Sequence, residues 1–260
     1  MSHPPRISII IATYNASVLL PDLLDSISKQ DYPHCEVVVV DGGSKDDTLQ
    51  VVHRYGDLVT SWISEPDRGI FDAWNKGLRL AKGDWVMFLG SDDCLLPDAL
   101  NQYVSFIDSL DHEVDFISSR VYYTDKNLVP YRVLGWAWEW PRFQREMTVA
   151  HPGSLHSRRL FEKYGVFSTA YRIVGDYEFL LRGRNELRTA FMDKVTVRFR
   201  EGGSSDSYAA IRECFHASVS TGKSPVVRSL LYTFSVYVKF SIRKFLRKFN
   251  LNLYLRRQET

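Results

Sequence analysis

The sequence predicts an α/β fold built on a doubly wound, mostly parallel sheet, and three observations lead to this prediction. Short β-branched runs alternate with segments whose apolar residues recur at helical spacing. The loops between these segments are short, which is typical of strands joined by crossover helices. Polar or acidic residues directly follow three of the runs, and in such sheets ligands bind outside the carboxyl ends of the strands.

The first 110 residues contain the regular elements. Each expected strand is a short apolar run of the kind that is buried on both faces of a parallel sheet. Each expected helix begins near a polar or proline residue and ends near a glycine or a change of pattern. We expect strands over residues 7–12, 36–40, 59–63 and 85–89, and helices over 18–27, 46–56, 70–81 and 97–110.

Beyond residue 110 the pattern is less regular. Aromatic-rich segments over 114–123 and 131–140 suggest antiparallel strands or loops. Trp136, Trp138 and Trp140 alternate as on a strand, so they are expected to share one face. The remaining pattern predicts a loop and short helix over 151–167, a helix over 176–184 and a strand over 189–199.

The charge of the chain is divided unequally along its length. The formal net charge is +2, yet residues 221–260 carry nine basic residues and one acidic residue, so the body before them is acidic overall. An acidic body argues against a nucleic-acid-binding main domain. It predicts an anionic partner for the tail alone, and membrane headgroups fit that description.

The tail itself, residues 221–260, is predicted to be a basic amphipathic helix. Its longest uncharged run is about ten residues, well short of the roughly twenty that span a bilayer. An interfacial helix would bury its apolar side chains while its basic residues reach headgroups. The alternative is a helix that packs on the body or mediates oligomerisation. The residues expected in the apolar face are Phe240, Ile242, Phe245, Leu246 and Phe249.

The cysteines and the N-terminus indicate a cytoplasmic protein. Cys35, Cys94 and Cys214 are odd in number and widely spaced, which fits reduced thiols better than a disulfide framework. The first six residues run directly into the first expected strand without an apolar signal region, so export is not expected. With the basic tail, this predicts a peripheral protein on the inner face of the cell membrane.

Asp92 and Asp93 form an acidic pair directly after the expected strand over 85–89. Two neighbouring carboxylates raise each other's pKa unless a cation neutralises them. Oxygen-only ligands favour Mg²⁺ or Mn²⁺, which bind few carboxylates and bridge substrate phosphates. The alternative is that the pair only caps the helix that opens at Pro97.

Four segments together resemble a known family. ISIIIATYN, VVVVDGGSKDDT, SEPDRGIFDAWNKG and GDWVMFLGSDD occur in the order and spacing of family 2 glycosyltransferases of the GT-A fold. The resemblance covers residues 7–205 and is greatest to bacterial enzymes that assemble O-antigen, capsule or exopolysaccharide. It implies a nucleotide-binding half over 1–110 and an irregular acceptor-side half over 111–220 of one GT-A domain, followed by the tail.

The resemblance also implies roles for the first-half residues. The segment after the first strand touches the nucleotide, Asp41 reads the base or ribose, and the next acidic stretch lines the donor site. Asp92 and Asp93 match the metal-binding motif, although this copy has Gly90 in place of an acid, which leaves open which aspartate is the direct ligand. The expected nucleotide-sugar-binding residues are Thr13, Tyr14, Asn15, Asp41, Asp67, Arg68, Asp72, Asn75, Lys76, Ser91 and Asp92. For Asp72 and Lys76 an exposed helical ion pair is the alternative.

On the acceptor side, HPGSLHSRRLFEKYGVF and VGDYEFLLR resemble the segments of the family that hold the acceptor. Asp176 would be the general base that takes the proton of the attacking hydroxyl. The family usually has Glu-Asp here and this chain has Gly175-Asp176, so the assignment rests on Asp176; the alternative is a helix N-cap. His151 is expected to line the catalytic pocket.

These implications lead to one functional hypothesis. We expect an inverting, metal-dependent glycosyltransferase that moves a sugar from a nucleoside diphosphate, UDP being the expected nucleotide, to a hydroxyl of a lipid-linked or growing glycan. The alternative is a nucleotide-sugar-binding or scaffold protein without catalysis. A dehydrogenase is disfavoured because no GxGxxG follows the first strand. An oligomer is compatible with the sequence.

Overall fold

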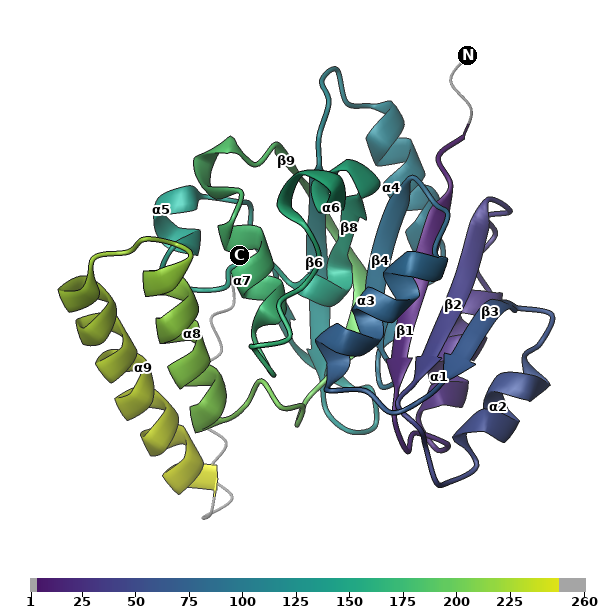
Figure 1. Cartoon of the computed structure of the whole chain (residues 1–260), viewed down its shortest axis with the longest axis horizontal. Coiled ribbons are helices and arrows are strands. Elements are labelled where there is room, and N and C mark those ends of the chain that lie inside the picture. The colour runs from purple at the N-terminus through teal and green to yellow at the C-terminus, as the bar shows by residue number, and fades with distance from the viewer. Residues whose placement is uncertain (1–3, 248–260) are drawn as a thin grey trace.

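Residues 4–247 fold around one curled sheet of nine strands in the order β3-β2-β1-β4-β8-β6-β9-β5, with β7 paired to β6 (Figure 1). The computed structural model describes residues 4–247. The strands are β1 Ile7–Thr13, β2 Cys35–Asp41, β3 Val59–Ser64, β4 Trp85–Gly90, β5 Cys94–Leu95, β6 Phe116–Thr124, β7 Pro130–Leu134, β8 Ser154–Ser157 and β9 Thr189–Arg200. The predicted α/β class and mostly parallel sheet are confirmed.

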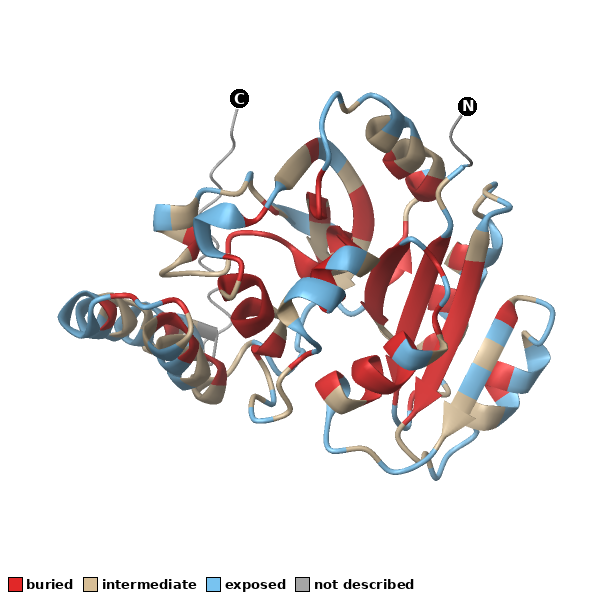
Figure 2. Cartoon of the chain, turned by 45° about the horizontal axis from the view of Figure 1, so that its top comes forward, coloured by how far each residue is buried: buried red, intermediate tan, exposed pale blue. Residues whose placement is uncertain are grey.

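The first half of the sheet is parallel and covered on both faces. Ile9 and Ile11 of β1 pack in the core cluster that contains the apolar residues of α1, whereas Ile10 packs in the cluster on the α3 side. Since both faces are buried, the strands have no polar face, which explains their continuous apolar runs. Figure 2 shows these central strands as almost wholly buried. The covering helices are α1 Leu20–Ser28, α2 Thr48–Arg54, α3 Ile70–Leu80 and α4 Ala99–Asp108.

The second half mixes strand directions. β6 pairs antiparallel with β7 and β8 but parallel with β9. The expectation of antiparallel strands or loops over 114–123 is therefore only partly correct, because the longest ladder of β6 is parallel. The other elements are α5 Trp140–Phe143, the 3₁₀ turn η1 His151–Gly153, α6 Arg158–Tyr164, α7 Gly175–Leu181 and the 3₁₀ turn η2 Arg184–Glu186.

The three alternating tryptophans do not lie on a strand, so that prediction is wrong. β7 ends before Gly135, which has a φ of 99°. A Cβ at Gly135 would lie 2.5 Å from the Ser119 carbonyl oxygen, so the chain leaves the sheet at the one residue type that fits. Trp140 begins α5, where Pro141 favours the first helical turn.

The last two described helices, α8 Tyr208–Ser220 and α9 Val226–Arg247, form a hairpin at one end of the molecule (Figure 1). The Tyr208 ring lies 4.7 Å from the Phe240 ring and 4.8 Å from the Tyr237 ring. Phe240 is therefore buried against α8. The sequence had instead predicted that it belongs to a free apolar face. Ile242 and Phe245 are exposed, and Phe249 lies outside the described residues.

The length and hydropathy of the helices also bear on membrane insertion. Within residues 4–247, none of the helices is both long enough and apolar enough to span a bilayer.

Candidate active site

Three strand ends bring predicted site residues to one edge of the sheet. β1 lies between β2 and β4 and is parallel to both, with Thr13 opposite Asp41 and Ala12 opposite Gly90. The carboxyl ends of these strands therefore share an edge, and the acidic pair follows directly after β4. This is the edge where ligands bind in open α/β sheets.

The turns after β1 and β2 are bonded to each other. Asn15, at a φ of 47°, donates its backbone N–H to Ser44 Oγ at 2.8 Å and accepts from the Lys45 N–H at 2.8 Å through Oδ1. Tyr14 is exposed beside this joint, and Thr13 Oγ1 is buried without a partner among the described residues. The loop predicted to touch a nucleotide is thus held in place by hydrogen bonds to the turn after β2.

Asp41 is fully buried at the end of β2. Its Oδ2 accepts from the N–H groups of Gly43 and Ser44, at 3.1 and 2.9 Å, and from Ser64 Oγ at 2.6 Å. Oδ1 accepts from Ser44 Oγ. This carboxylate therefore fixes the turn after β2, in addition to any ligand contact that it makes.

Asp67 reaches this same turn from the loop before α3. A Cβ at Gly42 would lie 2.5 Å from Asp67 Oδ2 and 3.4 Å from the Tyr14 ring, so only glycine lets the three segments meet. Asp67 Oδ1 also accepts from the Gly69 N–H at 2.8 Å, just before α3. The structure thus brings Tyr14, Asp41 and Asp67 to one place.

The other residues of this stretch take different positions. Arg68 is exposed and lies 3.4 Å from Asp72, whereas Lys76 is buried and its Nζ lies 2.8 Å from the Pro66 carbonyl and 2.9 Å from Glu65. Lys76 and Asp72 are 3.9 Å apart, at the limit of an ion pair.

Asn75 points elsewhere. Its amide donates to the Phe167 carbonyl and accepts from the Phe167 N–H, at 2.8 and 3.0 Å. Both halves of its amide are thus occupied by the loop after α6, so the structure assigns Asn75 a bridging role between α3 and the second half.

The acidic pair lies in a poorly solvated turn. Asp93 is only 2% exposed; its Oδ2 accepts from the Gly90 N–H at 2.8 Å, and its Oδ1 has no partner among the described residues. Burial raises the pKa of Asp92. Burial and then the charge of Asp92 raise the pKa of Asp93 well above its usual range. Ser91, beside them, is half-buried.

These features fit a divalent cation. A buried carboxylate oxygen without a partner, next to a second carboxylate, is an oxygen donor set that suits Mg²⁺ or Mn²⁺. Over residues 4–247 there is no cluster of three or more acidic, histidine or cysteine side chains that could hold a metal alone. A cation at this turn would therefore need further ligands from a substrate or from water.

The space around Gly90 explains why this chain departs from the family pattern at position 90. A Cβ at this position would lie 2.8 Å from Asp92 Oδ1. A third acid at position 90 would therefore have to displace the Asp92 carboxylate, and the turn holds two acids.

Arg200 is a site residue that the sequence analysis missed. It is buried at the end of β9, donates to Asp22 Oδ2 at 3.1 Å, and its positive charge acts against the burial that raises the pKa of Asp92 and Asp93. The pairing of Cys94 with Arg198 brings this end of β9 to the acidic turn. The only signal in the sequence was a basic residue at the end of an expected strand.

Asp176 lies in the first turn of α7. Burial raises its pKa to about 6, and its Oδ1 accepts from the Tyr177 N–H at 2.8 Å. A Cβ at Gly175 would lie 2.7 Å from the Phe71 ring of α3. Glycine at this position therefore lets the start of α7 approach the start of α3. The start of α3 belongs to the segment that is predicted to line the donor site.

A second acid holds the loop before α7. Glu213 of α8 accepts from three successive backbone N–H groups, those of Arg172, Ile173 and Val174, at 3.2, 2.9 and 3.2 Å. Val174 precedes α7 and has no side-chain cap of its own. Glu213 thus holds the segment that leads into α7 from another helix, and no local sequence pattern marks it.

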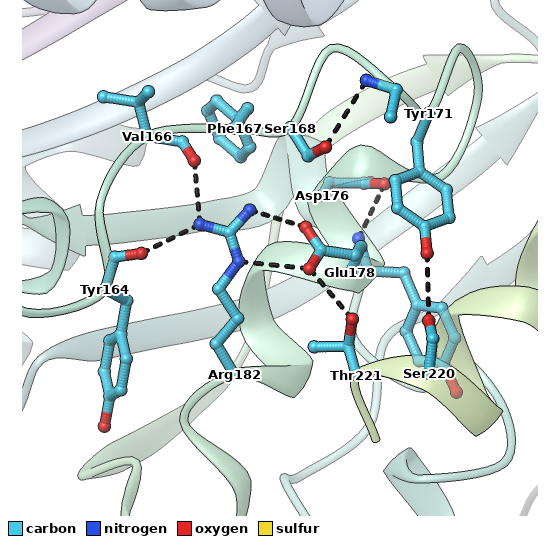
Figure 3. A network of polar contacts seen from close by, with 12 residues as sticks. Tyr164, Val166, Phe167, Ser168, Tyr171, Asp176, Glu178, Arg182, Ser220 and Thr221 are labelled. Carbon is cyan, nitrogen blue, oxygen red and sulfur yellow. Dashed lines mark hydrogen bonds and ion pairs between the residues drawn. The ribbon is translucent and has the colours of Figure 1, made fainter. Parts of the chain in front are cut away.

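Glu178 faces away from Asp176, as expected two residues along a helix. Figure 3 shows it paired with Arg182, whose Nη2 lies 2.6 Å from Glu178 Oε2, and bonded to Thr221 Oγ1 at 3.0 Å. Arg182 also donates to the carbonyls of Tyr164 and Val166, both at 2.8 Å. This network fastens α7 to its neighbours. Within residues 4–247, Asp176 is the acid of α7 that forms no ion pair.

His151 is placed inside an aromatic cluster. Its ring stacks on Trp74 at 5.0 Å and lies 5.0 Å from the ring of His156, and burial lowers the pKa of both histidines, so both are neutral. His151 Nε2 has no partner among the described residues. His151 therefore packs against α3.

Comparison with known proteins shows the family of the chain. The family model described as Glycosyl transferase family 2 matches residues 8–163. A PGL/p-HBAD biosynthesis glycosyltransferase of Mycobacterium tuberculosis (strain ATCC 25177 / H37Ra) is 34% identical over 211 residues, covering 78% of this chain and 80% of that one.

Solved structures share the fold. S. aureus TarS 1-349 in complex with UDP-GlcNAc has a TM-score of 0.66 at 22% identity, over 88% of this chain and 70% of that chain. Mannosyltransferase PcManGT from Pyrobaculum calidifontis, in complex with GDP-Man and Mn²⁺, has a TM-score of 0.61 at 23% identity, over 89% of this chain and 70% of that chain. With a family model that covers most of the chain and a relative that aligns over most of its length, this chain belongs to glycosyl transferase family 2.

Proposed function

We propose that the chain is an inverting glycosyltransferase that moves a sugar from a nucleoside diphosphate, preferentially UDP, to an acceptor hydroxyl. One observation carries the proposal. The proposal is supported by two groups of acids on different elements: a buried pair after β4, with an oxygen that has no partner among residues 4–247, and a single acid of raised pKa at the start of α7. An inverting transfer needs a charge-neutralising site for the leaving group and one base for the acceptor.

The donor would lie along the edge formed by β2, β1 and β4. Thr13, Tyr14, Asn15, Asp41 and Asp67 would face the nucleotide. Arg200, Arg68 and the Asp92–Asp93 turn would meet the diphosphate, since guanidinium groups bind phosphate oxygens in bidentate fashion. A bound Mg²⁺ or Mn²⁺ would stabilise the negative charge that develops on the leaving diphosphate.

Asp176 would act on the acceptor. Its carboxylate takes the proton of the attacking hydroxyl as the acceptor oxygen bonds to the anomeric carbon. The bond between that carbon and the diphosphate oxygen breaks, and the nucleoside diphosphate leaves with the electron pair. A pKa of about 6 keeps Asp176 ionised at neutral pH while it remains more basic than an exposed aspartate.

The acceptor is proposed to be a lipid-linked or growing glycan at the inner face of the cell membrane. Support comes from α9, which has no acidic residue and exposes an apolar stripe with basic residues beside it. The stripe comprises Val227, Leu231, Phe234, Val238 and Phe245, exposed by 71, 69, 69, 39 and 60%. Figure 2 shows α9 largely exposed at the edge of the molecule. A basic apolar helix of this kind binds anionic headgroups.

One assay tests the transfer reaction. Release of nucleoside diphosphate from a panel of UDP, GDP and dTDP sugars with Mn²⁺ should occur for the wild type and disappear in Asp93→Ala. Without turnover for any donor, a nucleotide-sugar-binding or scaffold protein would be the better description.

The membrane contact is tested separately. The full chain should float with vesicles that contain phosphatidylserine and not with neutral vesicles, and Leu231→Asp with Phe234→Asp should abolish flotation. A concentration-dependent dimer that these substitutions dissociate, without vesicle binding, would assign the stripe to self-association instead.

A further inference from the structure

A cavity of about 180 Å³ lies between the α8–α9 hairpin and the segment that follows α5. Much of its wall is apolar and is formed by Met147, Ala210, Ile211, Cys214, Phe215 and Val236. An apolar protein cavity of about 150 Å³ accepts a benzene-sized molecule. This cavity therefore has room for one ring or a short hydrocarbon segment.

Three polar groups of the wall, those of Glu146, Tyr232 and Ser218, are already bonded within the protein. Glu146 accepts from Tyr232 Oη at 2.5 Å and from Arg142 Nε at 2.9 Å. Ser218 Oγ donates to the Gln144 carbonyl at 2.7 Å. Because these groups are satisfied, the cavity favours an apolar guest over a sugar, whose hydroxyls would lose their bonds to water.

Arg145 adds a positive charge to this wall. Its Nε donates to the Pro141 carbonyl at 3.2 Å, and within residues 4–247 its terminal amino groups have no hydrogen-bonding acceptor. The adjacent Glu146 also lines the cavity, and its carboxylate is bonded to Arg142 and Tyr232. Burial raises the pKa of Glu146 and the charges of Arg142 and Arg145 both lower it, so two cations stand against one carboxylate and one positive charge is left in excess. The wall thus complements a molecule that carries an anionic group next to an apolar segment.

The cavity lies close to the proposed base. Cys214 lines the cavity, and burial together with the charge of Asp176 raises the pKa of this thiol to about 12. Its neighbour Glu213 holds residues 172–174, which lead directly into α7. A single turn of α8 therefore borders the cavity and also supports the helix that carries Asp176.

We propose that this cavity binds the apolar aglycone of the acceptor, with an anionic group of the same molecule at Arg145, while a sugar hydroxyl reaches Asp176. The inference rests on the proposed transferase function and adds a substrate class to it. Acceptors would be recognised through their hydrocarbon or aromatic part as well as through their sugar.

Binding is measured first, by isothermal titration of the full chain with hexyl phosphate, hexanol and inorganic phosphate. Hexyl phosphate should bind more tightly than either of the others. Ala210→Leu, which fills the cavity, should weaken binding by roughly tenfold or more, the effect of about one methylene in an apolar pocket. Arg145→Gln should reduce hexyl phosphate to the affinity of hexanol.

Two further variants control for misfolding of Ala210→Leu and for unspecific effects of a substitution in α8. Val236→Phe fills the half-exposed side of the cavity, where a larger side chain is better tolerated than at the buried Ala210. His216→Ala changes an exposed residue of α8 outside the wall and should bind like the wild type. If the wild type, Ala210→Leu and Val236→Phe all bound hexyl phosphate with equal affinity, the assignment of the cavity would be overturned.

Transfer kinetics then link the cavity to the acceptor. With a UDP-sugar donor, hexyl glycosides of glucose and N-acetylglucosamine should show a KM roughly tenfold below that of the methyl glycosides, and Val236→Phe should remove the difference. Equal KM values in the wild type would overturn the inference even if hexyl phosphate binds. If no glycoside is a substrate but hexyl phosphate binds, the apolar site is supported and the transferase proposal alone fails.

Discussion

The two halves of the sheet differ in the direction of their strands: the first half is all parallel, and the second half is mixed. β1, β2 and β3 follow one another along the chain and lie side by side, and β4 joins them on the other side of β1. In the second half, β6 pairs antiparallel with β7 and β8 but parallel with β9. The donor-side edge is thus made by the ends of parallel strands, whereas the acceptor side depends on a sheet of mixed direction and on helices α7 and α8.

This difference extends to how each acidic site is held. Asp41 and Asp93 are fixed by N–H groups within three residues of themselves. Asp176, in contrast, is positioned by Phe71 against Gly175 and by Glu213 from another helix. Substitutions on the two sides should therefore separate into effects on donor and cation binding and effects on turnover.

The largest expected effect is on turnover in Asp176→Asn. Loss of a general base lowers kcat by roughly 10²–10⁴-fold, while the donor-side edge is untouched. Steady-state kinetics should show this loss, and calorimetry should show unchanged UDP binding. A variant with normal kcat would exclude Asp176 as the base.

Asp93→Asn should affect the other side. We expect the affinity for UDP in the presence of Mn²⁺ to fall by roughly 10–100-fold, as when an orienting partner of a metal site is lost. Because burial and the charge of Asp92 disfavour an ionised carboxylate at position 93, the amide should also stabilise the ligand-free fold.

Calorimetry without metal is the control for this second effect. A gain of about 1 kcal/mol corresponds to a rise in Tm of roughly 2–4 °C for a chain of this size. Unchanged UDP affinity with Mn²⁺ would contradict the cation site.

The pH dependence of turnover should report Asp176. Its pKa is raised to about 6 by burial, and only the deprotonated form accepts a proton, so kcat should be constant above this pH and decrease as the pH falls below it. The slope should approach about tenfold per pH unit. UDP binding measured over the same range separates this limb from donor effects, and a kcat that is flat down to pH 5 would disprove the assignment.

The smallest expected effect comes from Glu213→Gln. This substitution keeps the shape of the side chain but removes the negative charge of the carboxylate that accepts hydrogen bonds from the N–H groups of residues 172–174. Hydrogen bonds to a charged group contribute about 1.5–3 kcal/mol, so the free energy of unfolding should fall by a part of that amount. We expect a few-fold lower kcat with unchanged donor KM, and Glu213→Asp should restore part of it. A change confined to donor KM would argue against a positioning role.

The first half could be predicted closely because its signals are local. A β-branched run, a polar turn and an amphipathic helix are each encoded by adjacent residues, and strand order then brings Thr13, Asp41 and the acidic pair to one edge. The four motifs of the resemblance indicated the family, and the comparisons confirm it. The roles assigned to the individual site residues stay predictions.

Other features required the tertiary structure. That Asn75 bonds Phe167, that Phe240 packs on Tyr208, and that Arg200 reaches the acidic turn are consequences of contacts between segments 32 to 107 residues apart. Gly90 and Gly175 looked like departures from a family pattern, and only the structure shows that the Asp92 carboxylate and the Phe71 ring occupy the space of their missing side chains. The sequence alone determined which local elements form, because propensity and periodicity act between neighbouring residues. Packing decided which side chains those elements present to the site, because a close contact depends on where distant segments meet.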